Sequence, residues 1–447
     1  MDRKDGFMNI LYLVNMNENN IKGLFTANHE KIMALKKLIK EDDVLNIYSV
    51  QFYDVGIVKL LKKIKKKKIF VNNGPEFEKD GLTYRKEYLK VDLYNRFIEK
   101  NDDDYKKYEP FINAHIKEIE ECDFVVAQWG YPHGRLAYHI WNRFKKPYFV
   151  QYYGSDIHTN PYRNSNVRKK ILDVLNNAEM NLFVSDNLRK SANGLGWNGD
   201  NWCLTKNCVN FDKFYDIGEE KKSAIRKKLG IEENQIVIGY VGSLTEVKRS
   251  DSLVEIYSRL NEKMNTNRKS IDSDDLDMDG STKSIDIGKK ISNLNPKYLF
   301  VGDGDMRTMI ENDAKNHSLD CVFTGNVDIS DVNEYMNIMD IMVLPSRREG
   351  FGSVIVEANS LGVLAIGSDA GGIPEVLGNE KYVVSEGDNF EDRYAEKILD
   401  FIKKGWNREE LISRVREEYD WTKVAAKDLE MMKSKVFGKR KESYNEK

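Results

Sequence analysis

The strongest candidates for ligand-binding residues are two glutamates. They lie in the stretch REGFGSVIVEAN, at residues 348–359. Glu349 stands before a turn that contains Gly350 and Gly352, and Glu357 follows a short apolar run. Glycine lets the backbone approach a ligand closely, and an ionised carboxylate can accept hydrogen bonds from two hydroxyls at once. The pattern therefore predicts contacts with a neutral, hydroxyl-rich ligand such as a sugar or a ribose. The alternative is a surface loop in which one glutamate caps a helix.

Phosphate chemistry is indicated by cations and by a helix start near the same stretch. The pattern from Ser353 onwards is helical, and a helix N-terminus offers free N–H groups and a positive dipole to an anion. Lys248 and Arg249 follow the strand pattern at residues 236–242. A hydrogen bond from Lys248 to phosphate would contribute roughly 1.5–3 kcal/mol. The sequence has no P-loop signature, which argues against an ATPase or kinase of that type.

The candidate residues follow short apolar runs of the chain, which alternate with amphipathic segments. Such runs are typical of parallel strands that crossover helices bury on both faces. They predict two doubly wound sheets, with a junction near residues 210–215. Ligands bind such sheets beyond the carboxyl ends of the strands, and Glu349 lies in that place. The runs are at residues 9–14, 44–50, 69–71, 123–128, 147–153, 180–185 and 202–207, then 236–242, 297–304, 321–325, 340–346, 363–368 and 381–385.

Glycine turns follow five of the strand patterns in the second half. One such turn is a weak signal, because glycine commonly ends a strand. Five turns at the same sheet edge, together with two cations, predict a pocket for a nucleoside diphosphate. The glycines are Gly242, Gly302, Gly304, Gly325, Gly350, Gly352, Gly371 and Gly372.

The composition describes a soluble chain with room for large cores. Of 447 residues, 40% are hydrophobic and 32% are charged, and the net charge of −2 argues against bulk nucleic-acid binding. The four cysteines are scattered, which favours reduced thiols over a disulfide framework or a zinc site. The N-terminal MNILYLVNM is better interpreted as a first strand than as a signal peptide. No apolar stretch approaches the roughly 18 residues of a membrane span, so a cytoplasmic location is expected.

A polar segment at residues 265–293 interrupts the pattern. It is rich in Ser, Asp and Lys, and it cannot bury enough apolar surface to order itself, so we expect a disordered surface insertion. Part of it resembles a calcium loop. However, the twelfth position counted from Asp272 is Lys283 rather than the required glutamate, which argues against calcium binding.

The second half resembles the family 4 retaining glycosyltransferases of GT-B architecture. The resemblance runs in order through VGSLTEVK, VGDGDMR, CVFTGNV and PSRREGFGSVIVEANSLGVLAIGSDAGGIPEVL. The first half is similar more weakly, through QWGYPHG, PYFVQYYGSDIH, VSDNLRK and NCVNFDKF. The stretches 50–120 and 265–293 look unrelated to the family.

The resemblance implies an α/β GT-B fold, in which two Rossmann-like doubly wound domains face a cleft and a C-terminal helix crosses back to the first domain. We expect an acceptor-binding domain at residues 1–212 and a nucleotide-sugar-binding domain at residues 213–421. Residues 422–447 would form the crossover helix and tail.

The resemblance also implies an activity. A hexose-type sugar would pass from a nucleoside-diphosphate sugar of UDP or GDP type to a saccharide or lipid-linked acceptor, in surface polysaccharide or glycolipid assembly, without a cofactor or a metal. Glu349 and Lys248 would be the catalytic residues; Glu349 would contact the sugar and Lys248 the diphosphate, while Glu357 would hold the ribose. The other residues expected to bind the donor are Gly23, Gly242, Ser243, Arg249, Gly325, Gly350, Phe351, Gly352 and Ser353.

Two departures from the family pattern affect the donor site. Ser243 stands where the family usually has an arginine, and Arg249 is the candidate to replace that charge. Tyr153 stands where the family often has a histidine that contacts the donor sugar. These departures keep two alternatives open: a catalytically silent sugar-nucleotide-binding subunit, and a sugar-nucleotide epimerase of similar fold.

Basic and aromatic residues in the first half allow two interpretations each. The lysines from Lys62 to Lys68 indicate either a solvated helix end or a basic patch that holds the protein against an anionic inner leaflet. His133, His158, Trp129 and Tyr131 are either acceptor contacts or structural residues.

Overall fold

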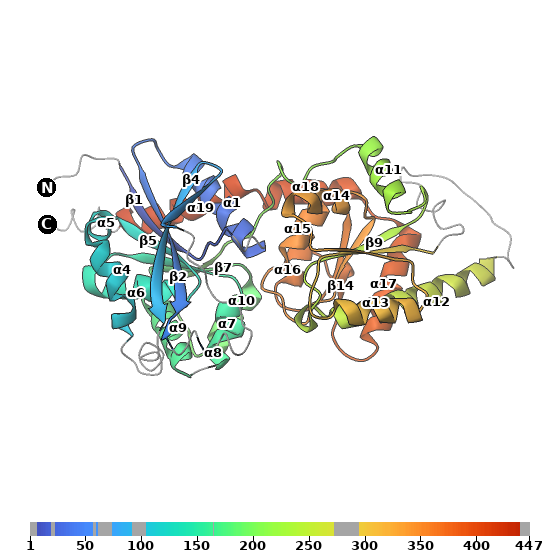
Figure 1. The fold of residues 1–447 in the computed structure, drawn as a ribbon, viewed down its shortest axis with the longest axis horizontal. Helices are drawn as coiled ribbons and strands as arrows, with labels where there is room; N and C mark the ends of the chain where they lie inside the picture. The colour runs from blue at the N-terminus through green and yellow to red at the C-terminus, as the bar shows by residue number, and fades with distance from the viewer. Residues whose placement is uncertain are drawn as a thin grey trace. The chain divides into compact units, whose positions relative to one another are not determined.

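The computed structural model describes residues 7–18, 23–56, 60, 74–91, 104–163, 165–271 and 295–438. The chain divides into two compact units, residues 1–207 with 421–447 and residues 208–420 (Figure 1). The sequence had predicted junctions after residues 212 and 421. The lysine run Lys62–Lys68 and the strand pattern at 69–71 lie outside the described residues.

A sheet with the strand order β3-β4-β2-β1-β5-β6-β7-β8 forms the centre of the first unit. All of its described pairings are parallel except β3 with β4. Every residue of β5 and β6 is buried, as expected for central parallel strands covered on both faces. The strands are β1 (Asn9–Val14), β2 (Val44–Asp54), β3 (Glu76–Lys79), β4 (Leu82–Val91), β5 (Phe124–Gln128), β6 (Tyr148–Tyr152), β7 (Met180–Phe183) and β8 (Trp202–Leu204).

The C-terminal helix α19 completes the first unit, as the sequence predicted. It packs beside α1 (Figure 1). Lys31 of α1 donates hydrogen bonds to Asp428 of α19 (Nζ–Oδ2 2.6 Å) and to Gln151 of β6 (Nζ–Oε1 2.6 Å), all among buried side chains. The helices of this unit are α1 (Gly23–Leu38), α4 (Tyr105–Ala114), α5 (Ile116–Glu121), α6 (His133–Phe144), α7 (Ser155–His158), α8 (Asn160–Arg163), α9 (Ser165–Asn177), α10 (Asp186–Gly194) and α19 (Trp421–Lys433).

The second unit contains a parallel sheet with the order β11-β10-β9-β12-β13-β14. Two doubly wound parallel sheets were predicted from the apolar runs, and this prediction is confirmed. The strands are β9 (Val237–Val241), β10 (Lys297–Val301), β11 (Cys321–Gly325), β12 (Ile341–Leu344), β13 (Leu364–Ser368) and β14 (Val383–Val384).

Helices cover the second sheet, with α12 packed along α17 and α15 against α18 (Figure 1). The sequence prediction of an insertion at 265–293 is wrong at its start. Residues 265–271 continue α12, and residues 272–294 are outside the described part of the chain. The helices are α11 (Glu219–Lys228), α12 (Leu253–Ile271), α13 (Arg307–Asn316), α14 (Ile329–Asn337), α15 (Ser353–Ser360), α16 (Ile373–Leu377), α17 (Phe390–Lys404) and α18 (Arg408–Glu418).

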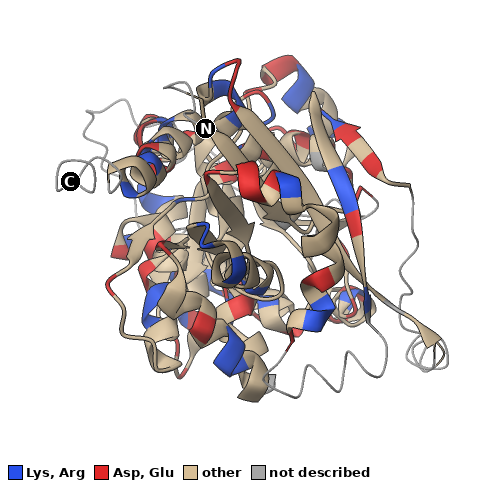
Figure 2. Cartoon of the chain, turned by 90° about the vertical axis from the view of Figure 1, so that its left-hand side faces the viewer, with Lys and Arg blue, Asp and Glu red and all other residues tan. Residues whose placement is uncertain are grey.

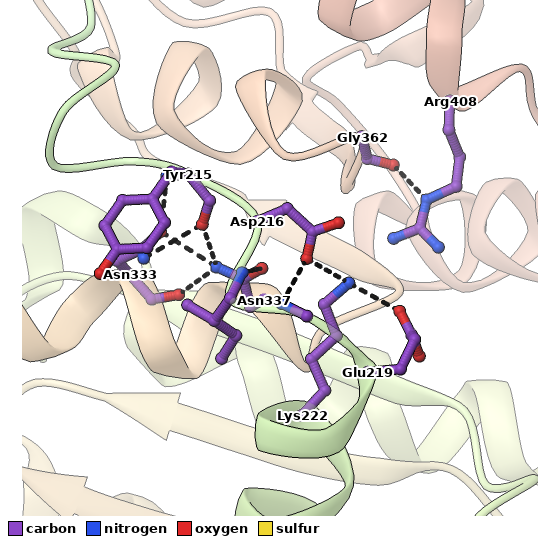
Figure 3. Close-up of polar contacts among 10 residues, drawn as sticks. Tyr215, Asp216, Glu219, Lys222, Asn333, Asn337, Gly362 and Arg408 are labelled. Atoms are coloured by element: carbon purple, nitrogen blue, oxygen red, sulfur yellow. Dashed lines mark hydrogen bonds and ion pairs between the residues drawn. The ribbon is translucent and has the colours of Figure 1, made fainter.

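The segment that enters the second unit is fixed by amide side chains of α14. Asn333 and Asn337 both donate hydrogen bonds to the carbonyl of Tyr215, at 3.2 and 3.0 Å (Figure 3). One residue later, the carboxylate of Asp216 binds Lys222 of α11 at 2.8 Å. The first contacts tie Tyr215 to α14, and the ion pair joins Asp216 to α11.

Charges of both signs are mixed along the described chain. Viewed from the left-hand side of Figure 1, the described lysines and arginines are interspersed with aspartates and glutamates (Figure 2). This distribution agrees with the net charge of −2. None of the helices in the described part of the chain has the length and hydropathy needed to cross a membrane.

Candidate functional site

Five loops meet along one edge of the second sheet. The order β11-β10-β9-β12-β13 makes the glycine turns neighbours, because the carboxyl ends of parallel strands share an edge. The loops pack backbone against backbone: the N–H of Gly242 donates to Val301 O (2.9 Å) and that of Leu244 to Asp303 O (3.0 Å). A Cβ on Gly304 would lie 2.2 Å from the carbonyl oxygen of Leu244. Only glycine fits at position 304. The sheet order confirms that the predicted glycine turns lie along one edge.

Glu349 and Lys248 are joined at this edge. The Nζ of Lys248 donates a short hydrogen bond to Oε2 of Glu349, and the Oε1 of Glu349 accepts one from the N–H of Gly350 at 3.1 Å. Lys248 follows β9 and Glu349 follows β12, which pair directly in the sheet. The two side chains remain 30% and 16% exposed, so a ligand can reach both.

The next loop fixes the backbone of Glu349. Its carbonyl accepts a hydrogen bond from the N–H of Gly372 at 3.1 Å. Gly371 has φ +61°, and a Cβ there would lie 1.7 Å from the same carbonyl oxygen. The loop after β13 therefore holds Glu349 in place, and a larger residue at 371 would displace it.

The helix α15 begins beside Glu349. Gly352, with φ +94°, precedes Ser353, the first helical residue, as the sequence predicted. Glu357 is the fifth residue of α15, a little more than one turn from its start. Burial raises the pKa of the Glu357 carboxyl from an ordinary 4.5 to about 7. Among the described residues, no side chain forms a hydrogen bond or ion pair with this carboxylate.

Arg249, expected to bind the donor diphosphate, contacts Glu386 and Phe390. Its guanidinium binds Glu386 (2.5 Å) and lies 4.0 Å from the ring centroid of Phe390, and the side chain is 9% exposed. Two 3-10 turns, Glu246–Lys248 and Ser250–Ser252, precede α12. Between them Arg249 adopts φ +51°, which separates the two cations. The structure thus brings Lys248, and not Arg249, to Glu349.

The remaining expected donor contacts occupy varied places. Ser243 is exposed, and its carbonyl accepts a hydrogen bond from the Tyr240 hydroxyl at 2.8 Å. Gly325 lies where a Cβ would meet the guanidinium of Arg307 at 2.8 Å. Phe351 is buried. Gly23 belongs to the first unit, as the first residue of α1.

Sequence reasoning missed two residues at this edge. Arg307 lies beside Gly325, and Arg347 follows β12. Both lie within motifs that the sequence already singled out, but a motif does not tell which side chains of neighbouring loops meet. The only available signal was an arginine close to a strand end.

In the first unit, His133 has a structural role. It is 1% exposed, and its Nε2 donates to the carbonyl of Val50 at 2.9 Å. Burial lowers its pKa to about 4, so the ring is neutral at pH 7. Nearby, the buried carboxyl of Asp156 accepts from the N–H of Gly154 at 2.9 Å and of Gly130 at 3.3 Å, and burial raises its pKa to about 6. Asp156 thereby ties together the loops after β5 and β6.

A cavity of about 450 Å³ opens at the opposite edge of the second sheet. Its wall includes Lys222, Asn337, Asp340 and Arg408, several of which appear in Figure 3. Asp340 precedes β12, so this cavity lies at the amino ends of the strands, where doubly wound sheets do not usually bind their ligands. Among the described residues, no group of three or more His, Cys, Asp or Glu side chains is placed to hold a metal ion.

Comparison with known sequences shows related proteins. Residues 277–418 match the family model of the glycosyl transferases group 1. The chain is similar to a Bacillus subtilis (strain 168) protein named as a teichuronic acid biosynthesis glycosyltransferase, TuaC, with 24% identity over 94% of this chain and 92% of that protein. It is also similar to the N-acetyl-alpha-D-glucosaminyl L-malate synthase of Bacillus anthracis, with 23% identity over 76% of this chain and 83% of that protein.

Solved structures share the fold. Anabaena Alr3699/HepE in complex with UDP has a TM-score of 0.66 and 14% identity, over 96% of this chain and 100% of that one. The sucrose-phosphate synthase of Thermosynechococcus elongatus has a TM-score of 0.68 and 15% identity, over 96% and 98% of the two chains. The architecture is therefore GT-B, with two Rossmann-like domains.

Proposed function

Since this chain belongs to the glycosyl transferases group 1 family, we propose that it is a retaining, metal-independent glycosyltransferase that uses a nucleoside-diphosphate hexose as donor. The sugar passes to a hydroxyl of a saccharide or lipid-linked acceptor. The bond between the sugar's anomeric carbon and the diphosphate oxygen breaks, and a bond to the acceptor oxygen forms on the same face of the sugar. The proton of the acceptor hydroxyl is released with the nucleoside diphosphate.

The observation that supports this best is the pairing of Lys248 with Glu349 at the glycine-lined edge. A cation that neutralises the departing diphosphate must stand beside a group that binds sugar hydroxyls. The N-terminus of α15 adds backbone N–H groups and a positive dipole at the same place. Fixed charges of this kind act where negative charge develops during bond cleavage.

The relatives support the substrate classes. The Bacillus subtilis relative is named for teichuronic acid biosynthesis, and Alr3699/HepE was solved with UDP and with UDP-glucose. We therefore propose a UDP-type or GDP-type donor and a role in surface polysaccharide or glycolipid assembly. We propose that the lysines from Lys62 to Lys68 bind the anionic inner face of a membrane, where a lipid-linked acceptor would be located.

The test of this function begins with nucleotide binding. UDP, GDP, ADP and CMP are compared by thermal shift, followed by the sugars of the nucleotide that binds. A stabilised protein that releases nucleoside diphosphate from one donor, faster with acceptor present, supports the proposal. A protein that binds none of the four nucleotides contradicts it.

A catalytically silent sugar-nucleotide-binding subunit is the second candidate. The ion pair between Arg249 and Glu386 favours a silent subunit. With Arg249 bound there, Lys248 lies beside Glu349 without the second cation that was expected to neutralise a diphosphate. Donor hydrolysis without acceptor separates the two candidates: a transferase hydrolyses its donor slowly, and a silent subunit binds the donor without turnover.

A further inference from the structure

The loop that carries Lys248 is bound to the loop that carries Glu349 by one arginine. Arg347 donates two parallel hydrogen bonds to the carboxylate of Asp251, Nη1–Oδ1 2.7 Å and Nη2–Oδ2 2.6 Å. Its Nη1 also donates to the carbonyl of Glu246 at 2.8 Å, and its backbone N–H donates to the carbonyl of Val247 at 3.0 Å. These contacts lie on both sides of Lys248 in the sequence.

We propose that Arg347 is a positioning residue that fixes the ammonium of Lys248 against the carboxylate of Glu349 by holding Asp251, Glu246 and Val247. This inference rests on the proposed function, because the position matters only if Lys248 and Glu349 share a donor.

The geometry of the loop explains why such a contact is needed. Lys248 ends a 3-10 turn, and a second 3-10 turn follows after Arg249. Such short turns have poorer hydrogen-bond geometry than an α-helix. The Arg347 side chain bonds residues 246 and 251, and its backbone N–H bonds residue 247, so this residue restrains the loop where the loop's own backbone restrains it weakly.

The choice of arginine also follows from the geometry. The planar guanidinium matches the two oxygens of a carboxylate, whereas the ammonium of lysine is a point charge. These hydrogen bonds hold the pKa of Asp251 below its ordinary range, so the pair stays charged at neutral pH. The two side chains are 36% and 29% exposed, and exposed ion pairs contribute little to stability. The effect of removing the pair should therefore appear in donor use and not in melting temperature.

Kinetics of three variants test the proposal. Arg347→Ala, Arg347→Lys and Asp251→Asn should each lower kcat/KM for the donor at least tenfold and change the melting temperature little. Misplacement of about 1 Å in a site can cost a hundredfold in rate, so an effect of this size is reasonable. The matched control is Glu334→Gln. This change breaks the ion pair between Lys221 and Glu334, whose side chains are 49% and 38% exposed and belong to separate segments. The Glu334→Gln variant should have wild-type kinetics.

A double-mutant cycle separates positioning from a general structural role. If Arg347 acts through Lys248, Arg347→Ala should add little to the loss already caused by Lys248→Ala. Exchange of the pair, Arg347→Asp with Asp251→Arg, should recover part of the activity. Independent, multiplying losses in the cycle would overturn the proposal.

Hydrogen exchange gives a readout that does not need a donor. Arg347→Ala should speed amide exchange at residues 245–252, and Glu334→Gln should leave it unchanged there. Unchanged exchange in Arg347→Ala refutes the positioning role even if the protein binds nucleotides. Faster exchange in a protein that binds no nucleotide supports the restraint and refutes the proposed function.

Discussion

At the scale of single residues, Lys248 and Glu349 neutralise each other before a ligand arrives. Both side chains remain partly exposed, so a ligand can reach them. In the proposed function a phosphate takes over the lysine while sugar hydroxyls take over the carboxylate. The consequences of changing either residue should therefore be found in turnover.

Glu349→Ala should reduce turnover at least a hundredfold, about 2.7 kcal/mol of barrier, because the proposed function makes this carboxylate a contact of the transferred sugar. Thermal melting and steady-state kinetics are measured on the same preparation. Glu349→Gln is the companion variant, since it keeps the size of the side chain and removes the charge. Normal turnover by a folded Glu349→Ala protein would falsify the sugar-contact assignment.

Lys248→Ala and Arg249→Ala should behave differently. Loss of Lys248 should lower turnover more than tenfold, at least about 1.4 kcal/mol of barrier. Loss of Arg249 should instead lower the melting temperature, because its guanidinium binds Glu386 and stacks on Phe390. If Arg249→Ala weakens donor affinity as much as Lys248→Ala does, the arginine must leave Glu386 for the diphosphate. In that case Ser243→Arg, from an exposed position, should rescue it.

The Glu357 carboxyl should make stability depend on pH. Its pKa is about 7 in the folded chain against an ordinary 4.5, so folding favours the protonated form. The free energy of unfolding is unaffected by this group below pH 4.5, where the carboxyl is protonated in both states. It falls by about 1–3 kcal/mol as the pH rises from 4.5 toward 7. Glu357→Gln should remove this loss, so that urea midpoints of the two proteins agree near pH 4.5 and the variant is more stable at pH 8. Parallel pH profiles would contradict the burial argument.

At the scale of elements, the site depends on loops that fit together without side chains. Gly371 is the clearest case, because its missing Cβ makes room for the carbonyl of Glu349. Gly230, after α11, has a similar φ of +63°, but a Cβ added there would have no atom within 4 Å. A substitution at Gly230 therefore isolates the effect of backbone conformation.

Gly371→Ala should lower both melting temperature and turnover, because the loops after β12 and β13 must separate. Gly230→Ala should cost only the strain of the left-handed conformation, about 1–2 kcal/mol, and leave kinetics unchanged. Differential scanning calorimetry and donor kinetics on both variants make the comparison. If both substitutions change the melting temperature and the kinetics equally, the contact between the added methyl group at 371 and the carbonyl of Glu349 has no energetic effect.

Elements with a strong periodic pattern could be predicted from the sequence. Continuous apolar runs identified β9, β10, β12 and β13, because buried parallel strands need them. The hairpin β3–β4 was missed, since half-exposed strands such as EFEK carry no such run. The end of α12 was also missed, because a polar stretch can still extend a helix whose earlier turns are anchored in the core.

The candidate site could be predicted only in part. Position beyond a strand end placed Lys248 and Glu349 at one edge, but nothing in the sequence paired Arg249 with Glu386 or Arg347 with Asp251. Those pairings join residues 137 and 96 positions apart. Local propensity does not encode contacts between loops that only the sheet order brings together.

At the scale of the whole molecule, a buried ion pair joins the two ends of the first unit. Lys31 and Asp428 are 5% and 4% exposed, and the hydroxyl of Thr205 completes the bonding of Asp428 at 2.6 Å. Breaking one half of such a pair leaves a buried charge without a partner.

Asp428→Ala should therefore destabilise the chain by about 3–5 kcal/mol, measured as the shift of the urea midpoint. The double change Lys31→Met with Asp428→Leu should be much milder, because it leaves no buried charge. A single variant as stable as the wild type would show that water or another group compensates Lys31.

The position of α19 has a consequence for the order of folding during synthesis. The ribosome releases Lys31 early, while its partner Asp428 is 397 residues away and not yet made. The second unit is one continuous stretch, residues 208–420, and can fold as soon as it has emerged. The first unit cannot complete its packing until α19, which lies against α1, has emerged. A chain released before Trp421 would leave that face of α1 uncovered, together with a lysine that lacks its carboxylate, and chaperones and proteases recognise such incomplete proteins.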